Sequence, residues 1–154
     1  MISRDLQGQI EQKFFKNKAI IVIGARQTGK TTLIKNILDS RKDKVLFFNG
    51  DEADTNDILN QLTITKLKGI IRDHKIVFFD EAQKIHNIGT VLKLIVDNFK
   101  DVQVIASGSS SFELMNTLNE PLTGRKYEFH LFPLSYSELV NHSGQVEEKR
   151  SLEN

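Results

Sequence analysis

The sequence predicts an α/β protein in which helices cover both faces of a parallel sheet. Four short apolar runs that do not alternate with polar residues lie at residues 19–23, 45–48, 76–79 and 102–106. Such runs are typical of strands that are buried on both faces. The segments between them show helical periodicity, which is clearest at Ile88, Val91, Leu92, Ile95 and Phe99. These positions fall on one stripe of a helix, so strands and helices alternate along the chain.

Two further elements are predicted at the ends of this alternation. Leu6, Ile10 and Phe14 recur at steps of four, which predicts an amphipathic helix before the first strand. The segment 127–131 has an apolar residue at every second position, unlike the four continuous runs. Because one face of such a strand is polar, we expect it at an edge of the sheet.

Composition limits the kind of protein. The chain has 154 residues, of which 39% are hydrophobic and 27% charged, so we expect one globular domain over residues 1–154. No apolar run approaches the roughly 20 residues that span a bilayer, and no apolar signal core precedes residue 12, so a cytoplasmic protein without a membrane anchor is expected. The absence of cysteine excludes disulfides and thiolate metal sites. The formal charge of +1 gives no overall attraction to nucleic acid.

A glycine-rich segment follows the first apolar run and leads into a helical segment. It satisfies the pattern G-x-x-x-x-G-K-[ST] with Gly24, Gly29, Lys30 and Thr31. Glycines let backbone N–H groups turn toward phosphate oxygens, the lysine reaches the β- and γ-phosphates, and the threonine helps to hold Mg²⁺. The sequence therefore predicts a Walker A nucleotide-binding loop formed by Gly24, Ala25, Arg26, Gln27, Thr28, Gly29, Lys30, Thr31 and Thr32.

An acidic pair ends the third apolar run, as in a Walker B motif. We expect Asp80 to hold Mg²⁺ together with Thr31, and Glu81 to orient and polarise the water that attacks the γ-phosphate. The alternative is that the pair merely caps the next helix. Small-molecule kinases do not usually need this glutamate, and the N-K-x-D motif of GTPases is absent, which favours ATP hydrolysis.

Polar residues after the fourth run are candidates for sensing the nucleotide. Ser107 is our first candidate for a side chain that touches the attacking water or the γ-phosphate, and Ser109 is the second. The alternative is an ordinary loop with one serine capping a helix at 112–118. Gln83, two residues beyond Glu81, is a candidate polar relay.

An arginine next to the predicted edge strand is a candidate arginine finger. Arg125 follows Gly124, and its guanidinium is expected to supply charge in the transition state, in its own site or in that of a neighbouring subunit. A solvated surface arginine is the alternative. Lys30, Glu81, Ser107 and Arg125 are thus the predicted catalytic residues.

The four motifs together resemble the AAA-type branch of P-loop ATPases. More narrowly, the segments GARQTGKTTLI, FFDEAQKI, IASGSSS and LTGRKYEFHLFPLSYSEL are similar to a prokaryotic group of AAA-domain proteins, over residues 16–140. The resemblance implies a three-layer P-loop NTPase fold with five parallel strands in the order 5-1-4-3-2. It also implies that this ATPase is the N-terminal part of a longer protein with a nuclease-like domain after it.

From the motifs and the resemblance we expect a switch or motor domain that binds ATP with Mg²⁺ and hydrolyses it slowly in isolation. The alternatives are a nucleotide-binding interaction module with little turnover alone, and a P-loop kinase of a small acceptor. A homo-oligomer is the expected partner arrangement if Arg125 acts in trans. A role with nucleic acid is suggested only by the resemblance.

Overall fold

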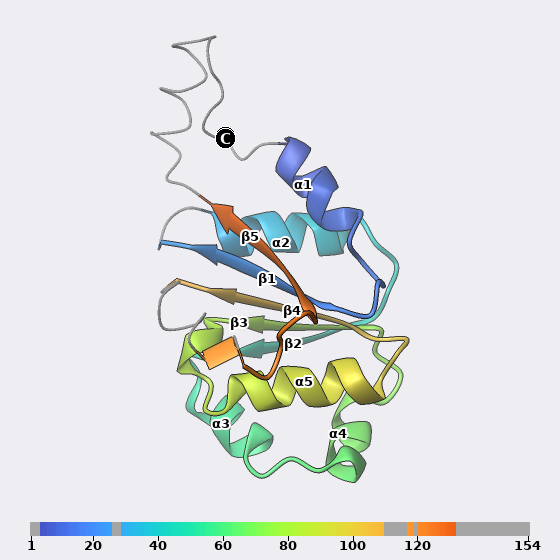
Figure 1. Cartoon of the computed structure of the whole chain (residues 1–154), viewed down its shortest axis with the longest axis vertical. Coiled ribbons are helices and arrows are strands. Elements are labelled where there is room, and N and C mark those ends of the chain that lie inside the picture. Colours follow the sequence, from blue (N-terminus) through green and yellow to red (C-terminus); the bar gives the residue numbers. More distant parts are fainter. Residues whose placement is uncertain (1–3, 26–28, 110–116, 119, 132–154) are drawn as a thin grey trace, which may run out of the picture.

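The computed structural model describes residues 4–25, 29–109, 117–118 and 120–131. Five parallel strands form one sheet in the order β2-β3-β4-β1-β5 (Figure 1). Read from the other edge, this is the predicted order 5-1-4-3-2. The strands are β1 (Ala19–Gly24), β2 (Val45–Asn49), β3 (Ile76–Asp80), β4 (Gln103–Gly108) and β5 (Lys126–Leu131). Strand β4 lies between β1 and β3, so the two Walker motifs follow strands that are not neighbours.

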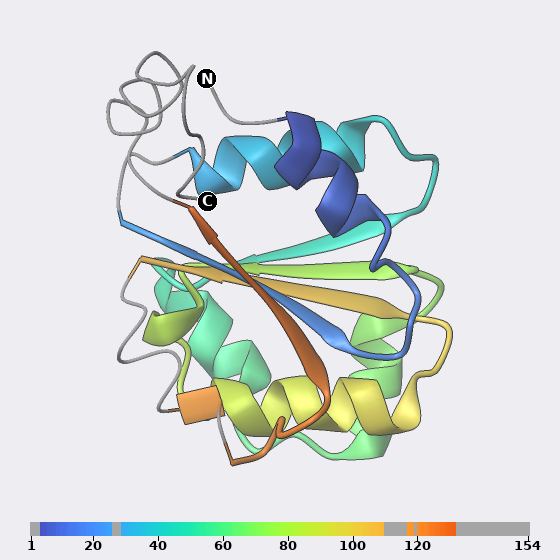
Figure 2. The same cartoon turned by 45° about the horizontal axis from the view of Figure 1, so that its top comes forward.

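Helices cover both faces of the sheet, as Figure 2 shows. One face carries α1 (Arg4–Glu11) and α2 (Lys30–Asp39). The other carries α3 (Ala53–Leu59), α4 (Ile64–Ile71) and α5 (Ile88–Asn98), and the short 3-10 helix η1 (Ala82–Lys84) follows β3. The three-layer α/β prediction is therefore confirmed. Of the helix predicted at 112–118, only 117–118 lie within the described residues, and these two are helical.

Two hydrophobic cores, one on each face of the sheet, hold the layers together. On the α2 side, Ile34 and Ile37 pack with Ile20, Phe78 and other strand residues. On the opposite side, alternate strand residues pack against α3, α4 and α5. Every residue of β1, β3 and β4 is buried, because these central strands have helices on both faces. Burial of this kind stabilises the fold by about 25 cal/mol per Å² of apolar surface.

Strand β2 corrects one expectation. Its continuous apolar sequence predicted burial on both faces, but β2 is the edge strand beside β3, and Phe47 is 43% exposed. An edge strand has a neighbouring strand on one side only, and only Phe48 of the five β2 residues is buried. The ammonium of Lys35 on α2 lies 5.2 Å from the centre of the Phe47 ring and covers it in part. The alternating segment 127–131 forms β5 at the opposite edge, as predicted.

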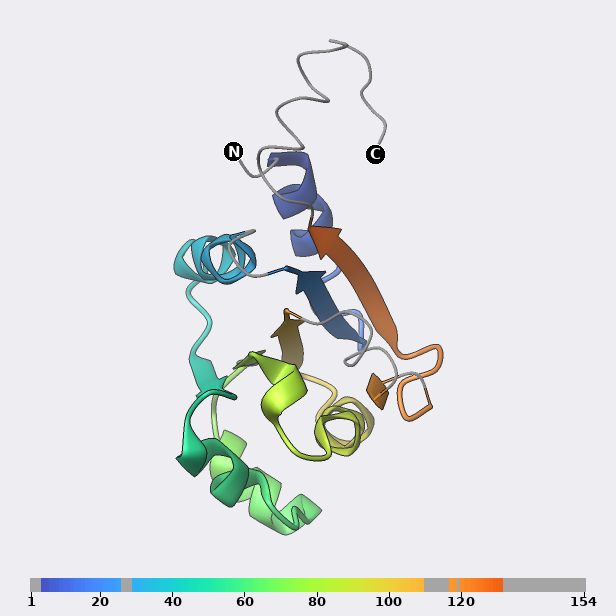
Figure 3. The same cartoon turned by 90° about the vertical axis from the view of Figure 1, so that its left-hand side faces the viewer.

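All strands run in the same direction, so their carboxyl ends meet at one edge of the sheet. Figure 3 looks at this edge, with the strand arrowheads pointing toward the viewer. In open parallel sheets, ligands bind outside the carboxyl ends of the strands, where the connections to neighbouring strands diverge. Residues that follow β1, β3 and β4 are therefore brought together there.

Candidate nucleotide-binding site

The Walker A segment joins the buried strand β1 to the start of α2. Gly24 ends the strand, and Lys30 and Thr31 occupy the first turn of the helix. Gly29 has φ 84°, a left-handed conformation that favours glycine, and its carbonyl accepts a hydrogen bond from Leu33 N at 2.8 Å. The first N–H groups of a helix lack intrahelical acceptors and can bind an anion. Arg26, Gln27 and Thr28 lie outside the described residues.

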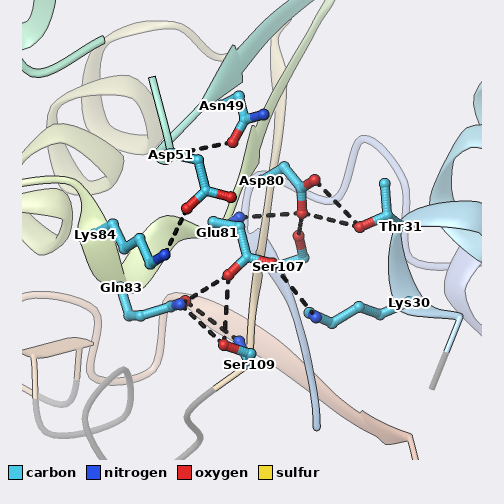
Figure 4. A network of polar contacts seen from close by, with 10 residues as sticks. All are labelled: Lys30, Thr31, Asn49, Asp51, Asp80, Glu81, Gln83, Lys84, Ser107 and Ser109. Carbon is cyan, nitrogen blue, oxygen red and sulfur yellow. Dashed lines mark hydrogen bonds and ion pairs between the residues drawn. The ribbon is translucent and has the colours of Figure 1, made fainter. Parts of the chain in front are cut away.

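Thr31 and Asp80 come together, as the sequence predicted. The Thr31 hydroxyl lies 3.0 Å from Asp80 Oδ1 and 3.2 Å from Asp80 Oδ2, and it donates to this carboxylate (Figure 4). Asp80 points to the α2 face because Ile76, Phe78 and Asp80 alternate along β3. The pair offers a hydroxyl and a carboxylate, which are the oxygen ligands that Mg²⁺ prefers. Thr32, the last predicted residue of the loop, is exposed on α2.

Glu81 has an uncommon backbone conformation. Its φ of 51° and ψ of 49° are left-handed, which costs free energy in a residue other than glycine and is common at functional sites. The conformation turns the chain sharply after β3. The Glu81 carboxylate then lies beside the Walker A helix, with Oε2 3.7 Å from Lys30 Nζ. Both side chains are mostly buried, so this ion pair lies inside the site rather than on its rim.

Gln83 and Ser109 form a polar ring with Glu81. Gln83 Nε2 donates to Glu81 Oε1 at 2.9 Å and to Ser109 Oγ at 3.0 Å. Ser109 Oγ lies 3.4 Å from Glu81 Oε1, and Ser109 N donates to Gln83 Oε1 at 3.3 Å. Figure 4 shows the three side chains converging from η1, from the turn after β3 and from the end of β4. The second candidate sensor, Ser109, is therefore the serine that contacts the predicted base.

Ser107, the first candidate sensor, has a different position from the one expected. It is fully buried, and its hydroxyl donates to Asp80 Oδ1 at 2.6 Å. The reason is register: Phe79 pairs with Ala106, so the next residues on the two strands, Asp80 and Ser107, lie side by side. Ser107 thus orients the predicted metal-binding carboxylate, and contact of its hydroxyl with the attacking water stays a prediction.

Arg125 lies at the opposite end of the sheet from the Walker A loop. Its carbonyl accepts from Ala19 N at 2.9 Å, and Ala19 is the first residue of β1, whereas the loop follows the last. The guanidinium forms an ion pair with Asp97 of α5. Hydrogen bonding from Lys93 and the nearby Arg125 charge lower the pKa of Asp97. A role for Arg125 in its own site is therefore wrong, and its role in a neighbouring subunit stays a prediction.

The loop after β2 contributes contacts that sequence reasoning missed. Gly50 N donates to Asp80 O at 2.8 Å, and Gly50 lies so close to the Glu81 carbonyl that a side chain would collide with it. Asp51 forms an ion pair with Lys84 at 2.6 Å, and the side chain of Asn56 bonds the backbone of residues 84 and 86. These contacts hold the turn that presents Glu81. In the sequence, only the expected adjacency of the carboxyl ends of β2 and β3 indicated that these contacts could form.

The fold and this constellation define a P-loop NTPase. A segment with the Walker A sequence pattern connects the first strand to its helix, and an aspartate–glutamate pair lies at the end of β3. The family described as AAA domain matches residues 16–140, and the chain belongs to this family. The family and the fold support nucleotide binding by an ATPase-type domain.

Two uncharacterised proteins are similar in sequence. One, from Methanocaldococcus jannaschii, is 30% identical over 143 residues, which is 91% of this chain and 31% of that protein. One from Mycobacterium bovis is 27% identical over 124 residues, which is 79% of this chain and 26% of that protein. The chain thus spans less than a third of these relatives. The matches do not support the nuclease-like domain that the resemblance implied.

Two solved structures share the fold. A Walker-type ATPase of Pyrococcus abyssi superposes with a TM-score of 0.58 at 16% identity, covering 92% of this chain and 58% of that one. A RuvB mutant from Thermotoga maritima gives a TM-score of 0.57 at 14% identity, covering 92% of this chain and 50% of that one.

Helices within the described residues are all too short or too polar to cross a membrane.

Proposed function

We propose that the domain binds ATP with Mg²⁺ and hydrolyses it to ADP and phosphate, as the switch or motor part of a larger protein. The observation that carries the proposal is the contact of Thr31 with Asp80, next to Lys30 and Glu81. A metal-binding hydroxyl, an aspartate, a phosphate-binding lysine and a candidate base thus meet at the carboxyl edge of the sheet. Asp80 and Glu81 do more than cap a helix, because both carboxylates contact the Walker A helix.

The donor set fits Mg²⁺ in a nucleotide complex. Among the described residues no group of three or more acidic or histidine side chains forms a metal cage. Mg²⁺ does not need one beside a nucleotide, because it keeps several waters and binds phosphate oxygens with one or two protein ligands. Thr31 and Asp80 would hold the ion, and Ser107 and Glu81 N would fix the Asp80 carboxylate. Bound Mg²⁺ supplies charge that stabilises the phosphate oxygens during transfer.

In the proposed reaction a water attacks the γ-phosphorus. The bond between that phosphorus and the bridging oxygen of ADP breaks, and Glu81 accepts a proton from the water. Lys30 donates hydrogen bonds to the β- and γ-phosphates and stabilises the charge that develops there. The ammonium is 3.7 Å from Glu81 Oε2, so a γ-phosphate bound by Lys30 would lie close to the base.

The test is phosphate release from ATP with no acceptor present, for the parent and for Glu81→Gln. We expect Mg²⁺-dependent release in the parent, and a fall of about 10² or more in the variant with ATP affinity nearly unchanged, since the amide keeps the shape and loses the base. Chelation of Mg²⁺ should abolish release. Binding without release in the parent would indicate an interaction module, and ATP consumption that requires an acceptor would indicate a kinase. Equal rates in parent and variant would remove Glu81 from the mechanism.

A further inference from the structure

The carboxylate of Glu81 is held at one of its two oxygens. Gln83 Nε2 and Ser109 Oγ both approach Oε1, at 2.9 Å and 3.4 Å (Figure 4). Both donors are neutral, and they come from different elements, η1 and the end of β4. No contact of either donor with Oε2 is found among the described residues. The two oxygens of Glu81 therefore have different surroundings.

The amide of Gln83 has one orientation that satisfies all its neighbours. Its nitrogen has two hydrogens, which match the two acceptors Glu81 Oε1 and Ser109 Oγ. Its oxygen accepts from Ser109 N at 3.3 Å. A flipped amide would place its oxygen against the Glu81 carboxylate and its nitrogen against an N–H group. The ring of contacts thus fixes the Gln83 side chain, and Gln83 in turn fixes Oε1.

The other oxygen of Glu81 faces the Walker A helix. Oε2 lies 3.7 Å from Lys30 Nζ, on the side where the phosphates would bind. Oε1 accepts hydrogen bonds from Gln83 and Ser109, whereas Lys30 Nζ is beyond hydrogen-bond distance of Oε2, so the lone pairs of Oε2 are available to a water. Oε2 is therefore the atom placed to take a proton from a water on the γ-phosphate.

We propose that Gln83 is a positioning residue for hydrolysis, which holds Glu81 Oε1 so that Oε2 is presented to the attacking water. The inference rests on the proposed function. A neutral amide suits this task, since it orients the carboxylate without adding a second cation to the Lys30 ammonium that already lies beside Oε2. The hydrogen bonds of Gln83 within the described residues go to Glu81 and Ser109, so it acts on the reaction through Glu81.

The experiment is a double-mutant cycle that combines Gln83→Met with Glu81→Gln. Methionine keeps the length and volume of glutamine and removes both hydrogen-bonding groups. For Gln83→Met we expect kcat to fall about tenfold or more, with KM and the measured affinity for ATP nearly unchanged. In the Glu81→Gln background the same substitution should lower kcat by less than about twofold, because the carboxylate it positions is absent. Gln9→Met, the same change at an exposed position of α1, is the matched control and should leave kcat unchanged.

The outcomes separate this inference from the proposed function. If the parent releases no phosphate, or Glu81→Gln turns over like the parent, the proposed function fails. If both behave as proposed and Gln83→Met keeps the parent kcat, only the positioning role is overturned. Equal losses in the two backgrounds would also overturn it, because a structural role does not depend on the Glu81 carboxylate. Should Gln83→Met melt well below the parent, Gln83→Glu replaces the donor by an acceptor of the same size. It must then show the same loss of kcat at unchanged ATP affinity, or the proposal fails.

Discussion

A single methyl group at Gly50 should remove the activity while leaving the nucleotide loop intact. A Cβ at this position would lie 3.1 Å from the carbonyl carbon of Glu81 and 3.3 Å from the carbonyl oxygen of Asp80, and closer still to the Glu81 oxygen. All three atoms belong to backbone, which cannot rotate out of the way as a side chain can. The turn that presents the Glu81 carboxylate must therefore move in Gly50→Ala.

The size of the effect follows from how far that turn must move. Relief of the clash needs a shift of about 1 Å, and overpacking of this kind typically costs about 1–3 kcal/mol of folding free energy. A displacement of about 1 Å at a catalytic group typically lowers the rate by about 10². No contact of Gly50 with Lys30 or Thr31 is found in the described part of the chain, so ATP affinity should stay within about threefold of the parent.

Two other glycines provide controls for the same chemical change. Gly89 on α5 would place a Cβ 2.7 Å from Pro121 Cγ and 2.8 Å from Thr117 O, and these nearest atoms do not belong to Glu81, so Gly89→Ala should lose stability and keep kcat for the folded fraction. Gly69 on α4 has nothing within 4 Å of its Cβ position, and Gly69→Ala should stabilise the helix by up to about 1 kcal/mol. Thermal melts would measure stability, phosphate release would measure kcat, and calorimetry with ATP would measure affinity. Parent-like turnover in Gly50→Ala, or a loss of kcat no greater than in Gly89→Ala, would refute the reasoning.

Two further predictions concern charged groups at opposite ends of the sheet. Lys30→Ala should weaken ATP binding at least tenfold, or about 1.4 kcal/mol, because it removes the cation expected at the β- and γ-phosphates; unchanged affinity in calorimetry would exclude that role. Asp97, whose pKa is lowered by the Lys93 hydrogen bond and by Arg125, should stabilise the fold above its ordinary pKa of about 3.9 and lose this contribution as the pH falls through the lowered value. Asp97→Asn should therefore unfold more easily than the parent by about 0.5–1 kcal/mol at pH 7, and the difference should shrink at acid pH. Denaturant titrations at several pH values would show this, and a difference that does not vary with pH would count against the ion pair.

The central sheet and the Walker residues could be predicted from the sequence because each has a strong local signal. Continuous apolar runs mark strands with helices on both faces, and β1, β3 and β4 are buried throughout. The Walker A pattern indicates a phosphate-binding loop only where it lies between a strand and a helix. The structure has both elements there, since β1 ends at Gly24 and α2 begins at Lys30. The run at 45–48 led to the wrong expectation that this strand is buried on both faces, because an apolar run does not show whether the strand lies at an edge of the sheet.

The remaining differences between expectation and structure come from geometry that a motif does not contain. Arg125 was expected near the site because β5 lies next to β1. In parallel strands, however, a residue that precedes β5 lies beside the start of β1. The site is at the other end. Ser107 was chosen because it comes first after the apolar run, although in the register with β3 it is buried against Asp80. The contact of Gly50 with the Glu81 turn depends on backbone proximity, which leaves no pattern in a single sequence.

The open edge at β2 affects how the molecule meets copies of itself. Within the described residues β2 pairs with β3 alone, so its outer side presents backbone N–H and C=O groups that could extend a sheet into another chain. The strand has only five residues, and the Lys35 ammonium lies over the exposed Phe47 ring. A short strand offers few groups for pairing, and the lysine charge must be dehydrated before a second strand can approach. Both features oppose edge-to-edge aggregation. The same lysine that partly covers an aromatic ring in the folded domain thus also protects the protein against association through its β2 edge.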